Sequence, residues 1–331
     1  MLNFDKESIL EYSKVGCSGV LALASNYLAS IDDRYIAIVS DILHHSGLVN
    51  IDEKYKDRVI NVGIAEQNEI GVATGLVNEG FEVYASVYTG FAVARALDQI
   101  KVSMGYMQMP IKIIAFDSGF NDSSLGPTHT ATSDLSILRA IPNITILSPC
   151  DATEFMKMLL ALHRYDRPAY IAIKIFCVPN VPMIYDKDYD YKIGKANTVY
   201  GNENADITFF ATGYMVYKSI EASKILEKSG IKCKVVNIHT IKPFDNEIIK
   251  ENINSKMFVT VEENNIIGGI GSLILEEMSN LNIYKKVCRI AVEDFYPKAG
   301  RYDDVLAHTG LDLDTIVRRV NDAFKEVQSG K

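Results

Sequence analysis

The sequence predicts an α/β protein built from two doubly wound domains, the second smaller than the first. Short runs rich in β-branched residues alternate with stretches of helical spacing, a pattern typical of parallel strands covered by helices on both faces. A stretch without periodicity, Phe176 to Ala205, interrupts this alternation, and a second alternation follows it. The length of 331 residues also fits two domains, at roughly 150 residues per domain.

The first domain is expected to contain a parallel sheet. Its predicted strands are the apolar runs Tyr35 to Ser40, Val59 to Ile64, Phe81 to Val87, Ile111 to Phe116, Ile144 to Leu147 and Ala169 to Ile175. Between them, Ile70 to Leu76, Ala92 to Met104 and Ala152 to Leu162 have the spacing of helices. A sheet with such crossovers is covered on both faces.

A linker and a second domain follow. Pro179, Pro182 and several tyrosines and aspartates mark the linker, so we place the domains at 1–178 and 196–331 and the linker at 179–195. The second domain's predicted strands are Ile207 to Ala211, Cys233 to Asn237, Met257 to Val261 and Val287 to Val292. Its predicted helices are Ser219 to Lys228, Asn246 to Asn252, Ser272 to Ser279 and Leu313 to Val327.

The composition excludes several classes of function. A hydrophobic fraction of 48% with 23% charged residues is typical of a soluble globular protein. The net charge of −8 and the absence of clustered Lys and Arg argue against nucleic-acid binding. The start of the chain lacks a signal pattern, and no apolar run reaches the ~20 residues of a membrane span. We therefore expect a cytoplasmic protein that does not enter a membrane.

The cysteines and histidines predict neither disulfides nor a metal site. The five cysteines lie far apart, and the six histidines avoid the spacings of metal ligands. We expect this chain to contribute no metal ligand.

Polar and aromatic side chains follow the predicted strands of the first domain. In parallel sheets ligands bind at the carboxyl ends of the strands. The residues expected at this edge are Asp41 to Gly47, Glu66, Tyr88 to Phe91, Asp117 to His129 and Lys174. They form a candidate site.

Glu66 is the residue of this set with the clearest chemical role. It stands in the motif GIAEQN, directly after an apolar run and before an apolar helix. Such a carboxyl should be poorly hydrated and should share a proton with a ring nitrogen of a bound heterocycle. The alternative is an ordinary glutamate in the first turn of a helix, favoured there by the helix dipole.

The ordered motifs along the chain resemble one family. The two domains resemble the pyrimidine-binding and carboxy-terminal domains of transketolase, a pair also found in deoxyxylulose-phosphate synthases and pyruvate dehydrogenase β subunits. The motifs that carry the resemblance are GIAEQN (63–68), YTGF (88–91), RALDQI (95–100), LGPTH (125–129), DLSILRAIPN (134–143), SPCDATE (148–154) and VEENNIIGGIGS (261–272).

The resemblance implies thiamine diphosphate as cofactor. By position, Glu66 matches the glutamate that bonds the aminopyrimidine ring and drives its proton shift. Phe91 matches the aromatic residue that stacks on this ring, with Tyr88 as a neighbouring wall and Asp41 also assigned to the cofactor site. His129 matches the histidine that stabilises or protonates the developing alkoxide. The alternatives are that the two aromatic residues only pack in the core and that the histidine lies in a loop with its hydrogen bonds made within the protein.

The resemblance also implies a partner subunit. Transketolases hold the diphosphate and its divalent ion with a Gly-Asp-Gly motif in a further domain, and this sequence has neither that motif nor length left for that domain. A diphosphate needs a metal ion and oxygen ligands. We therefore expect an N-terminal, diphosphate-binding partner subunit that mainly holds the Mg²⁺ or Ca²⁺ ion, in an α2β2 assembly.

Several substrate positions differ from the family pattern. Leu125 stands where transketolases usually carry an aspartate that reads a sugar hydroxyl. Lys174 stands where two arginines usually clamp the sugar phosphate, and His45 lies near a position that usually carries a small hydroxyl residue. With His129, these residues are the expected substrate contacts. Leucine in place of the aspartate makes this part of the pocket apolar, and lysine in place of the two arginines cannot bind a phosphate in the same bidentate way. Both differences predict an unusual or nucleotide-linked sugar as the substrate rather than a simple sugar phosphate.

The hypothesis is therefore a β-like subunit of a split, transketolase-like enzyme that moves a two-carbon ketol or acyl unit to an aldehyde or keto acceptor. A 2-oxo acid dehydrogenase β-type subunit and a deoxyxylulose-phosphate-synthase-like carboligase are the alternatives. A non-catalytic scaffold also stays open. A dinucleotide-dependent oxidoreductase is set aside, because no Gly-x-Gly-x-x-Gly follows the first predicted strand.

Overall fold

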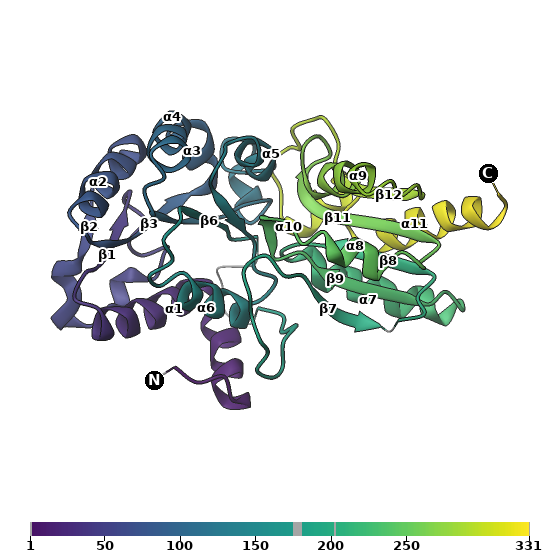
Figure 1. Cartoon of the computed structure of the whole chain (residues 1–331), viewed down its shortest axis with the longest axis horizontal. Helices are drawn as coiled ribbons and strands as arrows, with labels where there is room; N and C mark the ends of the chain where they lie inside the picture. Colours follow the sequence, from purple (N-terminus) through teal and green to yellow (C-terminus); the bar gives the residue numbers. More distant parts are fainter. Residues whose placement is uncertain (1, 175–180, 202, 331) are drawn as a thin grey trace.

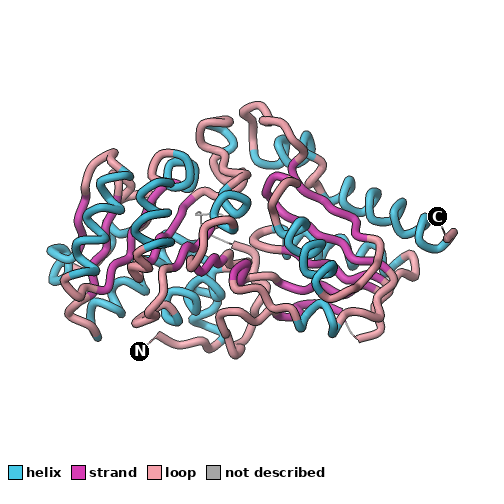
Figure 2. Tube along the Cα trace, turned by 45° about the horizontal axis from the view of Figure 1, so that its top comes forward, coloured by secondary structure: helices cyan, strands magenta, loops and turns pink. Residues whose placement is uncertain are grey.

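The chain forms two β-sheets with helices packed on both, as the computed structural model shows for residues 2–174, 181–201 and 203–330 (Figure 1). The sheets lie next to each other along the long axis of the molecule (Figure 2). Both are mostly parallel, so the predicted α/β class is confirmed. Within the described part of the chain, no helix has the length and apolar character that a membrane span requires.

The first sheet has seven strands in the order β10-β5-β6-β4-β3-β1-β2. The six strands from the first domain are parallel: β1 (Tyr35–Val39), β2 (Val59–Asn61), β3 (Glu82–Tyr88), β4 (Lys112–Phe116), β5 (Thr145–Leu147) and β6 (Ala169–Ala172). The seventh, β10 (Thr240–Lys242), comes from the second half of the chain and pairs antiparallel with β5. No pattern in the sequence indicated this crossing strand.

Helices cover both faces of the first sheet because its strands are apolar on both sides. On β1, Tyr35 and Val39 belong to a core with α1 and α6, whereas Ile36 and Ile38 pack with α2, α3 and α5. The elements are α1 (Lys6–Ile31), α2 (Glu66–Asn78), α3 (Thr89–Ala94), α4 (Leu97–Gln99), the π-helical η3 (Ile100–Tyr106), α5 (Asp134–Arg139), α6 (Ala152–Ala161) and the 3-10 turns η1 (Leu48–Asn50), η2 (Glu53–Arg58) and η4 (Ser123–Leu125).

The second sheet has the order β12-β11-β8-β9-β7, with β7 antiparallel to β9. Its strands are β7 (Asn197–Gly201), β8 (Ile207–Ala211), β9 (Cys233–Asn237), β11 (Met257–Asn265) and β12 (Val287–Val292). Its helices are α7 (Met215–Lys228), α8 (Glu247–Glu251), α9 (Ile270–Asn280), α10 (Tyr302–Thr309) and α11 (Leu313–Gln328). The predicted bounds of β8, β9 and β12 are confirmed to the residue.

One expectation about the elements is wrong. The helix predicted over Ala92 to Met104 is divided into α3, α4 and η3, because Arg95 and Ala96 both donate to the carbonyl of Phe91 and end the first piece there. The sequence analysis also missed α1, α5, α10, β7 and β10. The proposed domain bounds stay predictions.

One of the buried hydrophobic clusters contains residues from both domains. Ile146 and Tyr170 of the first sheet lie in the same buried cluster as Phe210, Val236 and Ile241. The residue Ile241 lies on β10 and is 1% exposed. Buried apolar area thus holds the two sheets to each other.

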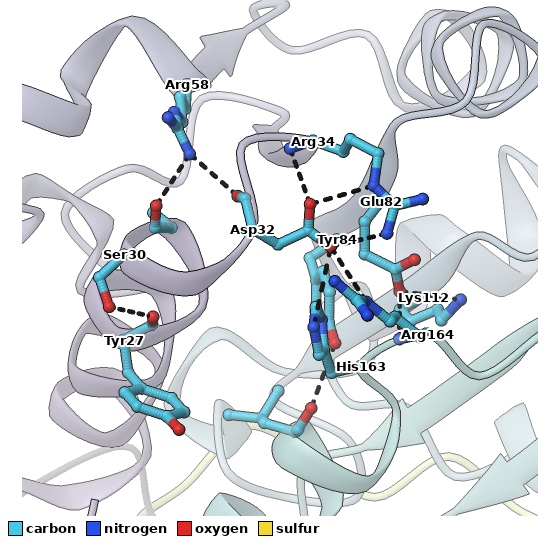
Figure 3. Close-up of polar contacts among 12 residues, drawn as sticks. Tyr27, Ser30, Asp32, Arg34, Arg58, Glu82, Tyr84, Lys112, His163 and Arg164 are labelled. Carbon is cyan, nitrogen blue, oxygen red and sulfur yellow. Dashed lines mark hydrogen bonds and ion pairs between the residues drawn. The ribbon is translucent and has the colours of Figure 1, made fainter. Parts of the chain in front are cut away.

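A charged cluster lies where α1 leads into β1, at the amino ends of the strands (Figure 3). The carboxylate of Asp32 accepts hydrogen bonds from the Arg34 side chain at 2.7 and 3.0 Å and from Arg164 at 3.4 Å, and His163 approaches it at 3.7 Å. Arg58 donates to the backbone carbonyl of Asp32 at 3.0 Å. The hydrogen bonds from Arg34 outweigh burial and hold the pKa of Asp32 well below its usual range.

We expect the Asp32→Asn variant to lower the free energy of unfolding at pH 7 by about 1–2 kcal/mol, because it removes charge-assisted hydrogen bonds. Because the pKa of Asp32 is lower in the folded state than in the unfolded state, its carboxylate stabilises the protein at pH values above the unfolded-state pKa. This stabilisation is lost as the pH falls, so the difference in unfolding free energy between wild type and variant should shrink below about pH 4. Urea unfolding at several pH values measures this. Asp33→Asn is the control, since the Asp33 side chain is 99% exposed. An equal effect of both variants would contradict the prediction.

Candidate active site

Glu66 lies at the carboxyl edge of the first sheet, in the first turn of α2. It is 3% exposed. The side-chain oxygen of Asn61, at the end of β2, accepts from the backbone N–H of Gly63 at 2.9 Å and of Asp41 at 3.1 Å. Gly63 has φ of 75°, a conformation that favours glycine. These hydrogen bonds fix the loop between β2 and α2, which positions Glu66 at the edge of the sheet, and they place Asp41 next to this loop.

Arg95 is the direct partner of Glu66. Its Nη1 lies 2.7 Å from Oε2 of Glu66, and its guanidinium lies 4.5 Å from the ring centre of Phe91. The sequence analysis did not identify Arg95 as a site residue. A signal existed, because residues four apart on a helix share a face and Arg95 follows Phe91 by four. The structure therefore links the predicted acid and the predicted stacking ring through one cation.

Four aromatic rings lie together near this pair. The ring centres of Phe91 and His129 are 5.4 Å apart, those of Tyr88 and Phe91 are 6.1 Å apart, and those of Tyr88 and His129 are 6.2 Å apart. His45 lies 5.0 Å from Tyr88. Phe91 and Tyr88 are half-buried. The structure thus brings together Tyr88, Phe91 and His129, which lie on two different segments, with His45, the expected substrate contact from a third segment.

His45 forms an ion pair with Asp117. Its Nε2 lies 2.5 Å from Oδ2 of Asp117, whose side chain is 5% exposed. Burial alone would lower the pKa of His45, but the hydrogen bond and charge of Asp117, with the charge of Asp122, outweigh it and raise the pKa. His45 therefore holds a proton more readily than a free histidine.

Asp122 is a further acid of the site, which the sequence analysis placed in the edge segment Asp117 to His129 without giving it a role of its own. Burial and the charge of Asp117 raise the pKa of Asp122, against the opposing charges of His45 and His129. The site therefore combines two histidines and three carboxyl groups, a set able to donate and accept protons.

Lys174 differs from its expected role as a substrate contact. The residue is buried, and its Nζ donates to Ser118 Oγ at 2.7 Å and lies 3.1 Å from Asp134 Oδ1. A lysine held in this way is not available to a phosphate, since moving it would leave Asp134 buried and unpaired. This placement speaks against the substrate role and assigns Lys174 to the interior.

Two other expected residues are exposed. Leu125 is 56% exposed at the end of η4, four residues before His129. Asp41 is exposed with φ of 60°, and Nδ2 of Asn61 lies 3.4 Å from its carboxylate. Both are accessible to a molecule that approaches this edge.

The described residues contain no group of three or more His, Cys, Asp or Glu side chains placed to hold a metal ion. The carboxylate of Glu66 and the flat faces of Phe91 and Tyr88 suit a neutral, planar heterocycle with a ring nitrogen.

Comparison with known proteins agrees with this geometry. The family model described as "Transketolase, pyrimidine binding domain" matches residues 13–174. The model described as "Transketolase, C-terminal domain" matches residues 194–316.

Relatives and a solved structure extend the match over almost the whole chain. It is 31% identical over 300 residues to one of the subunits of the apulose-4-phosphate transketolase of Phocaeicola vulgatus, covering 90% of this chain and 94% of that protein. It is 32% identical over 295 residues to "6-deoxy-6-sulfo-D-fructose transketolase subunit SqwH" of Clostridium sp. strain MSTE9, covering 89% and 90%. A structure titled "Split gene transketolase, inactive beta4 tetramer" superposes with a TM-score of 0.82 at 27% identity, covering 94% of this chain and 99% of that one. The chain belongs to the transketolase family.

Proposed function

We propose that this chain is the β-like subunit of a two-component, thiamine-diphosphate-dependent transketolase. In this proposal it transfers a two-carbon ketol or acyl unit to an aldehyde or keto acceptor. The observation that carries the proposal is the buried carboxylate of Glu66 at the carboxyl edge of the sheet, next to the rings of Phe91, Tyr88 and His129. Family membership supports the same reading.

In this proposal the chain's residues bind and serve the aminopyrimidine end of the cofactor. Phe91 and Tyr88 offer aromatic faces to the ring, Asp41 lies at the rim, and Glu66 holds the proton that is exchanged with a ring nitrogen. The bound cofactor supplies the carbanion chemistry of two-carbon transfer. His129 and His45 are proposed to donate hydrogen bonds to substrate oxygens, and the hydrogen bond and charge of Asp117 raise the pKa of His45.

We propose an unusual sugar as substrate. Lys174 forms an ion pair with Asp134 inside the protein, and Leu125 is an exposed apolar side chain. Neither residue therefore makes the contact to the sugar phosphate or to the sugar hydroxyl that ordinary transketolases make at these positions. The two relatives are named for apulose 4-phosphate and for a sulfonated fructose. These names support a substrate other than the common pentose and hexose phosphates.

A separate protein chain is proposed to bind the diphosphate and its Mg²⁺ or Ca²⁺, in an α2β2 assembly. The sequence has no Gly-Asp-Gly motif, and a diphosphate needs a cation and oxygen ligands. Apolar side chains are exposed beside the site, among them Ile64 at 74%. An exposed apolar residue two positions before Glu66 suits a surface that a partner covers.

Calorimetric titration of thiamine diphosphate with Mg²⁺ tests the proposal. We expect no saturable heat with this chain alone and stoichiometric binding once the candidate N-terminal subunit is added. Tight binding by this chain alone would contradict the shared site. With the pair assembled, transfer to ribose 5-phosphate at ordinary transketolase efficiency would contradict the unusual-substrate part.

A further inference from the structure

Glu69 is a second acid beside Glu66 that the proposed mechanism does not use. It lies three residues further along α2, on the same face of the helix. The residue is 0% exposed. The hydroxyl of Ser40, which follows β1, donates to Oε2 of Glu69, while Oε1 is buried without a hydrogen-bond partner among the described residues.

Such a carboxyl is costly to ionise, since one oxygen has neither water nor a donor. Burial raises the pKa of Glu69 to about 8, the hydrogen bond from Ser40 opposes the rise, and the charge of Glu66 adds to it. The neutral form of Glu69 therefore prevails at pH 7.

The surroundings of α2 leave Glu66 as the charge that acts on Glu69. The helix packs on β1, β3, α4 and η3. The titratable side chains on these elements are Tyr35, Glu82, Tyr84, Tyr88, Asp98, Lys101 and Tyr106. Among the described groups, Glu66 is the one whose charge raises the pKa of Glu69. The guanidinium of Arg95 forms an ion pair with Glu66.

We propose that Glu69 is a positioning residue for Glu66, and that the two buried carboxyls form a coupled pair in which a proton kept on Glu69 spares Glu66 a second negative charge one helical turn away. This rests on the proposed function of Glu66. While Glu69 is neutral, Glu66 is the one negative charge on this face of the first turn of α2, and Arg95 forms an ion pair with it. Once Glu69 is ionised, two negative charges lie one helical turn apart and repel each other.

Infrared titration of the isolated chain tests the pair without partner or cofactor. Burial also raises the pKa of Glu154, Glu262 and Glu263 to about 7, so the protonated-carboxyl band should have several components. We expect one component to disappear as the pH rises through about 8 and to be missing in Glu69→Gln, which keeps the side chain's size. Glu66→Gln should move the midpoint down by about one pH unit, because it removes the charge that favours the proton. Ser40→Ala should move it up, because the lost hydrogen bond favours the ionised form.

Glu79→Gln is the matched control, since Glu79 is exposed at the end of the same helix. It should leave this component and its midpoint unchanged. Absence of this component in the wild-type chain, or a midpoint that Glu66→Gln does not move, would overturn the coupled pair.

A second arm uses the assembled enzyme with thiamine diphosphate, Mg²⁺, hydroxypyruvate as the two-carbon donor and a sugar aldehyde as the acceptor. The kcat of the wild type should fall above about pH 8, and Glu69→Gln should remove this alkaline limb. An unchanged limb in Glu69→Gln would overturn the positioning role. Absence of transfer by every variant would overturn the proposed function, while the infrared result would still decide whether the pair is coupled.

Discussion

Replacing Glu66 by Gln is expected to reduce two-carbon transfer by a factor of about 10² to 10⁴, the usual effect of losing a general acid–base group. Glutamine keeps the size of the side chain and can still form hydrogen bonds, but its amide does not act as an acid or base near neutral pH. The residue is 3% exposed, so water has little access to replace the carboxyl. The measurement is kcat of the assembled enzyme at saturating thiamine diphosphate and Mg²⁺.

The control for this variant separates chemistry from assembly. Glu79→Gln makes the same chemical change at an exposed position of α2 and should leave kcat unchanged. Partner binding by Glu66→Gln, followed by calorimetry, should stay within a few-fold of wild type. Wild-type activity of Glu66→Gln would exclude the proposed role of this carboxyl.

Replacing Lys174 by Met is expected to lower the free energy of unfolding by about 3–5 kcal/mol, because it leaves a buried carboxylate without its charge partner. Both Lys174 and Asp134 are 0% exposed. The remaining hydrogen bonds to Asp134, from Ser118 at 2.5 Å and Tyr170 at 3.3 Å, do not neutralise its charge. Urea unfolding at pH 7 followed by circular dichroism measures the loss.

Two comparisons make this result specific to the buried pair. Lys192→Met should change stability little, since Lys192 pairs with Asp190 at the surface, where ion pairs contribute about 0–1 kcal/mol. A double variant, Lys174→Met with Asp134→Leu, should recover part of the lost stability, because no unpaired charge is then buried. A Lys174→Met protein as stable as wild type would show that this ammonium is not part of the structural interior.

The sequence predicted those parts of the molecule that depend on local periodicity. Buried parallel strands are short and apolar on both faces, so the bounds of β8, β9 and β12 followed from composition alone. The location of the candidate site also followed, because loops at the carboxyl edge of one sheet must meet. Glu66, Tyr88, Phe91 and His129 lie on segments that the structure brings together, while their roles in catalysis and cofactor binding stay predictions.

Contacts made across long sequence separations were beyond this reasoning. The ion pair of Arg95 with Glu66 depends on where α3 ends, and the burial of Lys174 depends on Asp134, forty residues earlier in the chain. The resemblance to the family had placed Lys174 at the substrate, and because charged residues are usually exposed, nothing local in the sequence opposed that placement. The three residues of β10 carry no periodic signal of their own.

The strand β10 has a consequence for any attempt to divide the chain. Cutting it within the linker and separating the halves would remove the antiparallel neighbour of β5 and uncover its backbone N–H and C=O groups. It would also expose to water the apolar side chains that the two sheets share. An open strand edge beside an apolar surface is a template for pairing with other chains. The separated halves are thus expected to aggregate, and limited proteolysis of the intact protein should leave fragments that stay associated until the whole molecule unfolds.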